Sequence, residues 1–349
     1  MSVRLPNPLS AVVWLAFFLP AGLWSGWLDR GFAAAVFLLG CVVLISKESP
    51  WEARKPSARA LRLFLLLEIL YVFSCLYSAA FNGVQFGPLD WFELLRYVFL
   101  GTFVVYLIRH YDSRVRGAMD SAMAASLYAA LLFPSLDPQG GAALLTLCYL
   151  LFFSKLRLRF LHAATALLVV FFSGALASWT AVLFVLCAAL AVGLYRFLVR
   201  RRNRAAVFAS LALYLLLMTG AAFCVRLKPG AVAGVPAAGA PQQALRLLRR
   251  SPLLGWGQAE FEGVSSAENQ YVLWLLKSGG VGAGVILLGL LFAGYRLLSG
   301  ASSDVARLAG TAAFIGSVAM MLATGPFLES FRMFFLTAFF MTGMQEAKR

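Results

Sequence analysis

The chain concentrates its polar chemistry in one stretch, "LLRRSPLLGWGQAEFEGVSSAENQYVLWLLKSGG" from Leu247 to Gly280. Three arginines, Arg246, Arg249 and Arg250, have the spacing i, i+3, i+4, so a helix would place them on one face. A guanidinium is a planar fork of donors that suits phosphate oxygens. We therefore expect this face to bind an anionic substrate such as a pyrophosphate. The alternatives are that it binds anionic lipid headgroups or caps a helix.

A carboxylate follows these arginines in the segment "SSAENQY", at the start of an apolar helix. Glu268 is the acid, and Asn269 comes directly after it. A carboxylate that is partly desolvated at a lipid–water boundary is suited to take a proton from a sugar hydroxyl. Glu268 is therefore the candidate general base. The alternative is helix capping, because carboxylates near a helix N-terminus are stabilised by the helix dipole.

Two further arginines lie in or beside apolar spans, where a charge is costly. Arg332 stands at the outer end of the last span, with Glu329 three residues before it. Arg96 lies one turn into another span and follows Glu93. Each arginine is a candidate substrate-binding residue in a cavity that opens outward. The alternative in both cases is a local ion pair with the neighbouring acid.

The composition predicts an integral membrane protein. Of 349 residues, 61% are hydrophobic and only 13% are charged, whereas soluble domains are about half apolar and a quarter charged. Apolar runs long enough to span a bilayer recur along the chain. The predicted fold is all-α, with about twelve transmembrane helices in one domain, 1–349. The cysteines and histidines form no metal-ligand pattern, so we expect no metal and no cofactor.

The predicted spans are numbered along the chain. The sixth span is short, and residues 270–277 are expected to form a short helix that enters the tenth. The spans are residues 9–28, 31–46, 61–81, 91–108, 118–134, 140–153, 160–177, 179–198, 205–225, 281–298, 306–324 and 327–343.

The basic residues fix the predicted orientation of these spans. The formal net charge is +15, and most of the excess lies at the chain ends and in the loops after even-numbered spans. The positive-inside rule therefore places both termini and these loops in the cytoplasm. Residues 226–268 then form the one larger outer loop, between spans nine and ten, and it is periplasmic in a Gram-negative cell. Because the charge is explained by topology, no nucleic-acid partner is expected.

The segment from Arg249 through Phe292 resembles the signature of the O-antigen polymerase and O-antigen ligase superfamily. The resemblance is carried by Pro252–Gly257 in "RRSPLLGWGQAEF", by Glu268–Asn269, and by Gly279–Gly282. The earlier span "LDWFELLRYVFL", which contains Arg96, is also similar to that family. The ligase branch usually has His before the Asn, so Glu268 favours the polymerase branch.

The resemblance implies a lipid-linked glycan glycosyltransferase of the bacterial inner membrane, which is inverting and independent of metal. The donor would be an oligosaccharide on undecaprenyl pyrophosphate, and the acceptor a hydroxyl of another lipid-linked repeat unit. The product would be a surface polysaccharide, an O-antigen or an exopolysaccharide. The arginines would stabilise the pyrophosphate leaving group, Glu268 would activate the acceptor, and Asn269 would position one substrate. A membrane protein that regulates chain length is a further expected partner.

Two other functions remain open at this point. A ligase would transfer the glycan from undecaprenyl pyrophosphate to a lipid core or a protein. A transporter or flippase of lipid-linked sugars would also have many spans with both ends inside, but such proteins usually show repeated halves and polar residues in the middle of the membrane.

Overall fold

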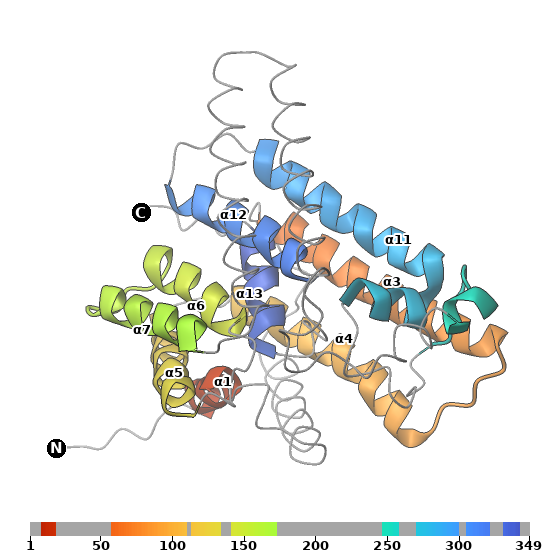
Figure 1. Ribbon diagram of the computed structural model, residues 1–349, viewed down its shortest axis with the longest axis horizontal. Helices are drawn as coiled ribbons and strands as arrows, with labels where there is room; N and C mark the ends of the chain where they lie inside the picture. The colour runs from red at the N-terminus through yellow and green to blue at the C-terminus, as the bar shows by residue number, and fades with distance from the viewer. Residues whose placement is uncertain are drawn as a thin grey trace.

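The computed structural model describes residues 8–18, 57–109, 113–133, 141–172, 246–257, 270–299, 305–321 and 331–342. Within these ranges the chain forms helices joined by short turns and no strand, so the all-α class is confirmed for the described residues. The helices labelled in Figure 1 are α1 (Pro8–Phe18), α3 (Ser57–Phe81), α4 (Pro88–Arg109), α5 (Ser113–Leu132), α6 (Gly141–Phe152), α7 (Arg159–Phe172), α11 (Gln270–Ser299), α12 (Val305–Met320) and α13 (Phe331–Met341).

The helices occur where the sequence predicts apolar spans. The span predicted at 61–81 is α3, the one at 91–108 is α4, and the one at 306–324 overlaps α12. The short helix predicted at 270–277 is confirmed, since α11 begins at Gln270 and leaves helical geometry at Gly279. The spans predicted at 31–46, 179–198 and 205–225 lie outside the described residues.

Two of the described helices are long and apolar enough to cross a membrane, Arg62–Phe81 in α3 and Gln270–Leu298 in α11. Only 33% and 28% of their most apolar windows are buried within the protein. Large apolar side chains such as Phe73 and Leu288 are therefore exposed on their outer faces. A soluble protein rarely exposes so much apolar surface, so these faces suit contact with lipid.

Helices α3 and α11 pack side by side and antiparallel (Figure 1). Gly282 of α11 lies against Ser74 of α3, and Gly289 lies against Leu67. Both pairs are separated by seven residues, or about two helical turns, so they repeat along one seam. Small residues at such a seam let two helices approach closely, which increases van der Waals contact where the hydrophobic effect is weak.

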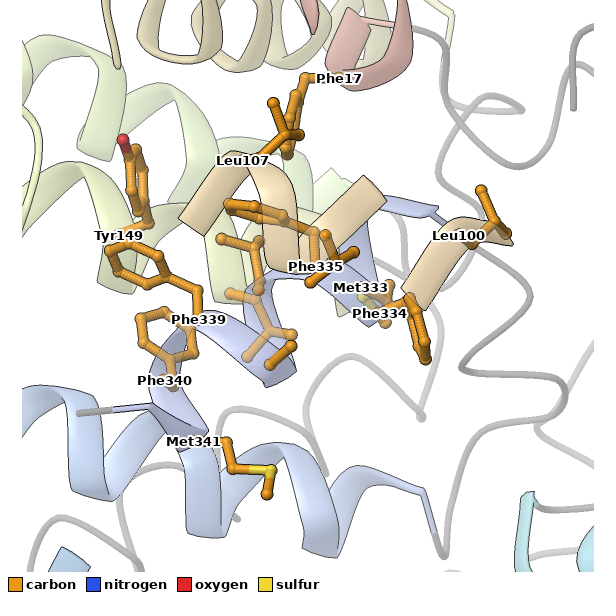
Figure 2. Close-up of a cluster of buried hydrophobic side chains, with 14 of the residues drawn as sticks. Phe17, Leu100, Leu107, Tyr149, Met333, Phe334, Phe335, Phe339, Phe340 and Met341 are labelled. Carbon is orange, nitrogen blue, oxygen red and sulfur yellow. The ribbon is translucent and has the colours of Figure 1, made fainter. Parts of the chain in front are cut away.

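Helix α13 lies at the centre of the described bundle and is buried on all sides from Arg332 to Met341. Apart from Arg332 and Thr337, its sequence is apolar around the whole circumference, which is typical of a helix enclosed by others. Phe339 packs edge-on against Tyr149 of α6, and Phe335 packs against Phe17 of α1 (Figure 2). It also contacts α3, α4, α11 and α12. The core of the described residues is therefore built around α13.

The α3–α11 seam makes a stability prediction with an internal control. A Cβ at Gly289 would lie only 2.3 Å from a methyl carbon of Leu67, whereas a Cβ at Gly284 meets nothing within 4 Å. Overpacking of this kind costs roughly 1–3 kcal/mol. We expect Gly289→Leu to lower the midpoint of thermal unfolding of the solubilised protein and Gly284→Leu to leave it unchanged. Equal midpoints for the two variants would contradict the seam.

Candidate functional site

The segment that carries the predicted arginines begins with a helical turn at residues 246–250. Leu247 and Leu248 pack against Leu276 of α11, and the indole N–H of Trp256 donates to the carbonyl of Leu247 (3.0 Å). One side of the turn is therefore fixed to α11. The arginine spacing places three cations away from the leucines, and all three are exposed: Arg246, Arg249 and Arg250.

Helix α11 is interrupted beside this turn. Gly279 has φ 68° and ψ −178°, which no helical residue adopts. In an unbroken helix the N–H groups of Gly280 and Val281 would bond to the carbonyls of Leu276 and Lys277. The break removes these two bonds and leaves two carbonyls and two N–H groups that need partners.

The backbone of the Pro252–Gly257 turn satisfies all four of these groups. The N–H groups of Trp256 and Gly257 donate to the carbonyls of Leu276 and Lys277, with N···O distances of 2.7 and 2.8 Å. In return, the carbonyls of Pro252 and Leu253 accept hydrogen bonds from the N–H groups of Gly280 and Val281 at 2.9 and 3.1 Å. Two intrahelical bonds are thus replaced by four bonds between the turn and α11, and we call this arrangement the clasp.

Helix α3 completes the clasp from the other side. The Ser78 hydroxyl donates to the carbonyl of Leu254. The Asn82 amide donates to the carbonyl of Gly255 at 2.6 Å and lies 3.3 Å from the Ser251 hydroxyl. Since the Gly255 N–H bonds to the Ser251 carbonyl, every carbonyl from residue 251 to residue 255 accepts a hydrogen bond. The turn is therefore held by both helices.

Close backbone contact requires the glycines of the Pro252–Gly257 turn and of the α11 break. A Cβ on Gly255 would lie 2.8 Å from the carbonyl oxygen of Leu276 and would overlap the backbone of Gly279. A Cβ on Gly257 would lie 2.9 Å from the carbonyl oxygen of Cys75 in α3. Gly255, Gly257 and Gly279 also have positive φ, which L side chains rarely adopt. The turn and the α11 break thus meet in one close backbone contact, which needs glycine on both sides.

The predicted base lies outside the described residues, as does Asn269. Helix α11 begins directly after them at Gln270, and its first N–H donates to the carbonyl of Met321 at 3.0 Å. The sequence therefore places Glu268 and Asn269 immediately before an anchored helix start. Arg96 lies within α4, but its side chain is also outside the described part of the chain.

Arg332 is placed away from the other predicted arginines. It is buried at the start of α13, and its guanidinium donates to the carbonyls of Phe17 and Phe18 at the end of α1. Carbonyls at the end of a helix have no partner within it, and the negative end of the helix dipole also stabilises a cation there. Figure 1 shows α1 and the teal segment, residues 246–257, on opposite sides of the molecule. Arg332 thus caps a helix, and its role in substrate binding stays a prediction.

Sequence reasoning missed a buried acid, Glu68 of α3, which is only 9% exposed. It lines a cavity between α3, α11 and α13. The signal was present in the sequence, because Glu68 is the one charged residue in the apolar run "LFLLLEILYVF". A carboxyl inside an apolar span is by default a candidate for function.

A second missed acid, Asp120 of α5, has a structural role. Its carboxylate accepts hydrogen bonds from the Ser154 hydroxyl at 2.8 Å and from the Lys155 N–H at 3.3 Å. Arg116 lies one helical turn earlier, and its positive charge interacts with the Asp120 carboxyl group. Asp120 therefore fixes α5 to the turn between α6 and α7.

The break in α11 predicts a strong dependence on Gly279. Its combination of φ and ψ is open essentially to glycine alone, and strain of this kind costs about 1–3 kcal/mol. We expect Gly279→Ala to lower the thermal unfolding midpoint and to expose the 252–257 turn to protease. Gly284→Ala is the matched control, since Gly284 lies in the same helix with open space around it. Protease resistance equal to that of the control would argue against the clasp.

Asn82 tests the other side of the clasp. Asn82→Ala leaves the carbonyl of Gly255 without its side-chain donor, and an unsatisfied buried polar group costs about 1–3 kcal/mol. We expect this loss in the free energy of unfolding, measured by denaturant titration. Gln85→Ala is the control, because Gln85 is exposed on the following turn. A loss of similar size in both variants would show that the clasp bond contributes nothing specific.

The described part of the site is thus a cationic helical turn fixed by a backbone clasp to one end of the α3–α11 pair. Four hydrogen bonds join the turn to α11, and Ser78 and Asn82 join it to α3. Comparisons of the chain with protein-family models, with curated proteins and with solved structures find no match.

Proposed function

We propose that this chain is a multi-pass glycosyltransferase of the bacterial inner membrane. It polymerises oligosaccharide repeat units carried on undecaprenyl pyrophosphate into a surface polysaccharide, an O-antigen or an exopolysaccharide. The reaction takes place on the periplasmic face, inverts the anomeric carbon and needs no metal. The single observation that carries this proposal is the exposed arginine face, Arg246, Arg249 and Arg250, on a backbone that is held by the clasp.

The antiparallel packing of α3 and α11 supports the proposed topology. In a twelve-span chain with both termini in the cytoplasm, the third span runs outward and the tenth runs inward. Their outer ends are then the end of α3 and the start of α11, and the clasp joins these two ends. The arginine face thus lies on the periplasmic side in this topology. The predicted outer loop, residues 226–268, carries five cations there, which departs from the positive-inside rule.

The rigidity of the arginine face suits a pyrophosphate leaving group. Donors that are fixed in advance where negative charge develops stabilise a transition state without reorganisation. Arg249 and Arg250 directly precede Ser251, which the clasp holds at Asn82. Their backbone is therefore positioned before substrate arrives, while their exposed side chains remain free to meet phosphate oxygens at the membrane surface.

The proposed reaction is a single displacement. Glu268 takes the proton of the acceptor hydroxyl while the hydroxyl oxygen attacks the anomeric carbon. The bond between that carbon and the pyrophosphate oxygen breaks, and its electron pair leaves with undecaprenyl pyrophosphate. The arginines neutralise the added charge. Attack from the face opposite the leaving group inverts the anomeric centre. Asn269 and Arg96 position the sugars in this scheme.

A lipid-linked sugar transporter is the second candidate, and Glu68 is the observation that favours it. Transporters use ionisable residues near the middle of the membrane, and Glu68 occupies the middle of α3. A ligase shares the chemistry of the polymerase and differs only in its acceptor. Both alternatives are therefore separated from the polymerase by the products formed in a purified system.

The first experiment uses purified protein in nanodiscs with undecaprenyl-pyrophosphate-linked repeat units, EDTA and no nucleotide sugar. We expect a ladder of products on a gel. The double variant Arg249→Ala/Arg250→Ala should reduce the rate by roughly 10²-fold or more, since loss of one fixed donor to a developing anion costs about that much. Arg157→Ala, at another exposed arginine, should retain the rate. No ladder from folded protein with intact substrate rejects the polymerase; transfer to lipid core in that case indicates a ligase.

The proposed base is tested in the same assay. Glu268→Gln removes the proton acceptor but keeps the size of the side chain, and general base catalysis contributes typically 10²–10⁴-fold. We expect a loss in that range, with insertion into the membrane and thermal unfolding unchanged. Polymer formed at the normal rate would remove Glu268 from the mechanism and leave helix capping as its role.

A further inference from the structure

The turn between α6 and α7 carries three exposed cations close together in the sequence: Lys155, Arg157 and Arg159. Neither α6, the turn nor α7 contains an acid. None of the three cations forms an ion pair within the part of the chain that the structure describes. Figure 1 shows α6 and α7 on the left and residues 246–257 on the right, at opposite ends of the molecule. This cationic turn is therefore distinct from the arginine face and has no role in the proposed reaction.

Buried groups hold the backbone of the cationic turn in place. The Asp120 carboxylate of α5 accepts hydrogen bonds from the Ser154 hydroxyl and from the N–H of Lys155. The same hydroxyl accepts a hydrogen bond from the N–H of Leu156 at 3.1 Å, and the Leu156 side chain packs against the hydrophobic core. Every second residue of the segment is therefore left to carry a cation outward from a backbone that is already positioned.

Helix α7 continues from the cations with an exposed apolar stripe. The spacing of three and four residues places the members of the stripe on one face of the helix, and the other face is buried. The Arg159 guanidinium lies over the ring of Phe160, 5.0 Å from its centroid, so the charge directly adjoins the start of the stripe. An exposed apolar surface of this kind suits contact with acyl chains. The stripe consists of Phe160, Leu161, Ala164, Leu167, Leu168, Phe171 and Phe172.

The two adjoining surfaces define the class of ligand. Lysine and arginine donate strong, charge-assisted hydrogen bonds to phosphate oxygens, and the apolar stripe accepts hydrocarbon. A ligand that uses both surfaces has a phosphate at one end and an acyl chain at the other. A soluble phosphate compound would leave the stripe unused. A zwitterionic phospholipid would bring its ammonium group next to three cations and gain less from them. The surfaces together therefore fit an anionic phospholipid.

We propose that the cationic turn binds an anionic phospholipid of the membrane. The phosphate lies at Lys155, Arg157 and Arg159, and an acyl chain follows the exposed stripe of α7. In the twelve-span topology this turn is cytoplasmic, so the lipid comes from the inner leaflet, where basic segments next to a span attract anionic headgroups. The lipid takes no part in the polymerisation, and the site does not rest on the proposed glycosyltransferase activity.

Phosphatidylglycerol and phosphatidylcholine with the same two acyl chains form a matched pair for the test. Each is added to the full chain in a neutral detergent, and native mass spectrometry gives the dissociation constant of the first bound lipid. We expect phosphatidylglycerol to bind roughly tenfold or more tightly, since each cation near an anionic headgroup contributes about fivefold. Glycerophosphoglycerol, the same headgroup without chains, should not displace it. Equal constants for the two lipids would overturn the proposal, and displacement by the soluble headgroup would show that the occupant is not a lipid.

Variants then locate the bound headgroup. Lys155→Gln/Arg159→Gln should weaken phosphatidylglycerol binding roughly 25-fold, at about fivefold per cation, and leave the binding of phosphatidylcholine unchanged. Arg62→Gln/Arg296→Gln is the matched control, because it removes two positive charges from exposed arginines near the start of α3 and the end of α11. The twelve-span topology places these arginines on the same side of the membrane. A similar loss in both variants, or unchanged phosphatidylglycerol binding by folded Lys155→Gln/Arg159→Gln, would refute the site.

Discussion

The contact between Gly255 and Gly279 is the constraint on which the candidate site depends. The two backbones meet so closely that neither residue has room for a side chain. Gly279 interrupts α11, and the interruption frees the hydrogen-bonding groups that the turn requires. The helical turn with the arginines is joined to this contact through Ser251 and Leu247. The position of the three arginines therefore depends on the lack of a side chain at Gly255 and at Gly279.

The same contact explains how an irregular segment exists between apolar helices. Non-helical backbone at membrane depth is tolerated only where protein groups satisfy it. Here α11 supplies partners on one side, and Ser78 and Asn82 of α3 supply them on the other. The remainder of the described bundle surrounds α13, whose apolar circumference allows burial on all sides. Hydrogen bonding thus shapes the end of the α3–α11 pair, while the centre is built mainly by packing, with Arg332 joining α13 to the end of α1 by hydrogen bonds.

The sequence predicted the helical class and the positions of the helices, because apolar runs bounded by basic loops are local signals. It also predicted the short helix from Gln270, since the Gly279–Gly280 pair marks a local break. It did not predict that Pro252–Gly257 fills that break, because contacts between distant segments leave no periodic signal. Arg332 is a candidate site residue in the sequence because it is a cation at the outer end of the last span, and its contact with α1 joins segments from opposite ends of the chain. Glu68 is marked in the sequence as a lone charge within an apolar run, but the sequence does not show what surrounds it.

The clasp also decides how this end of the protein is able to move. A loop that is tied only at its ends swings independently of the helices beside it. The 252–257 turn is bonded to both sides of the α11 break and to α3, so displacing it alone would strand several backbone groups at about 1–3 kcal/mol each. The arginines therefore travel with α3 and the first part of α11 as one mechanical unit. A flap motion of the loop is therefore suppressed, and in the function proposed above the entry of a bulky glycan would require the tilting of a helix pair.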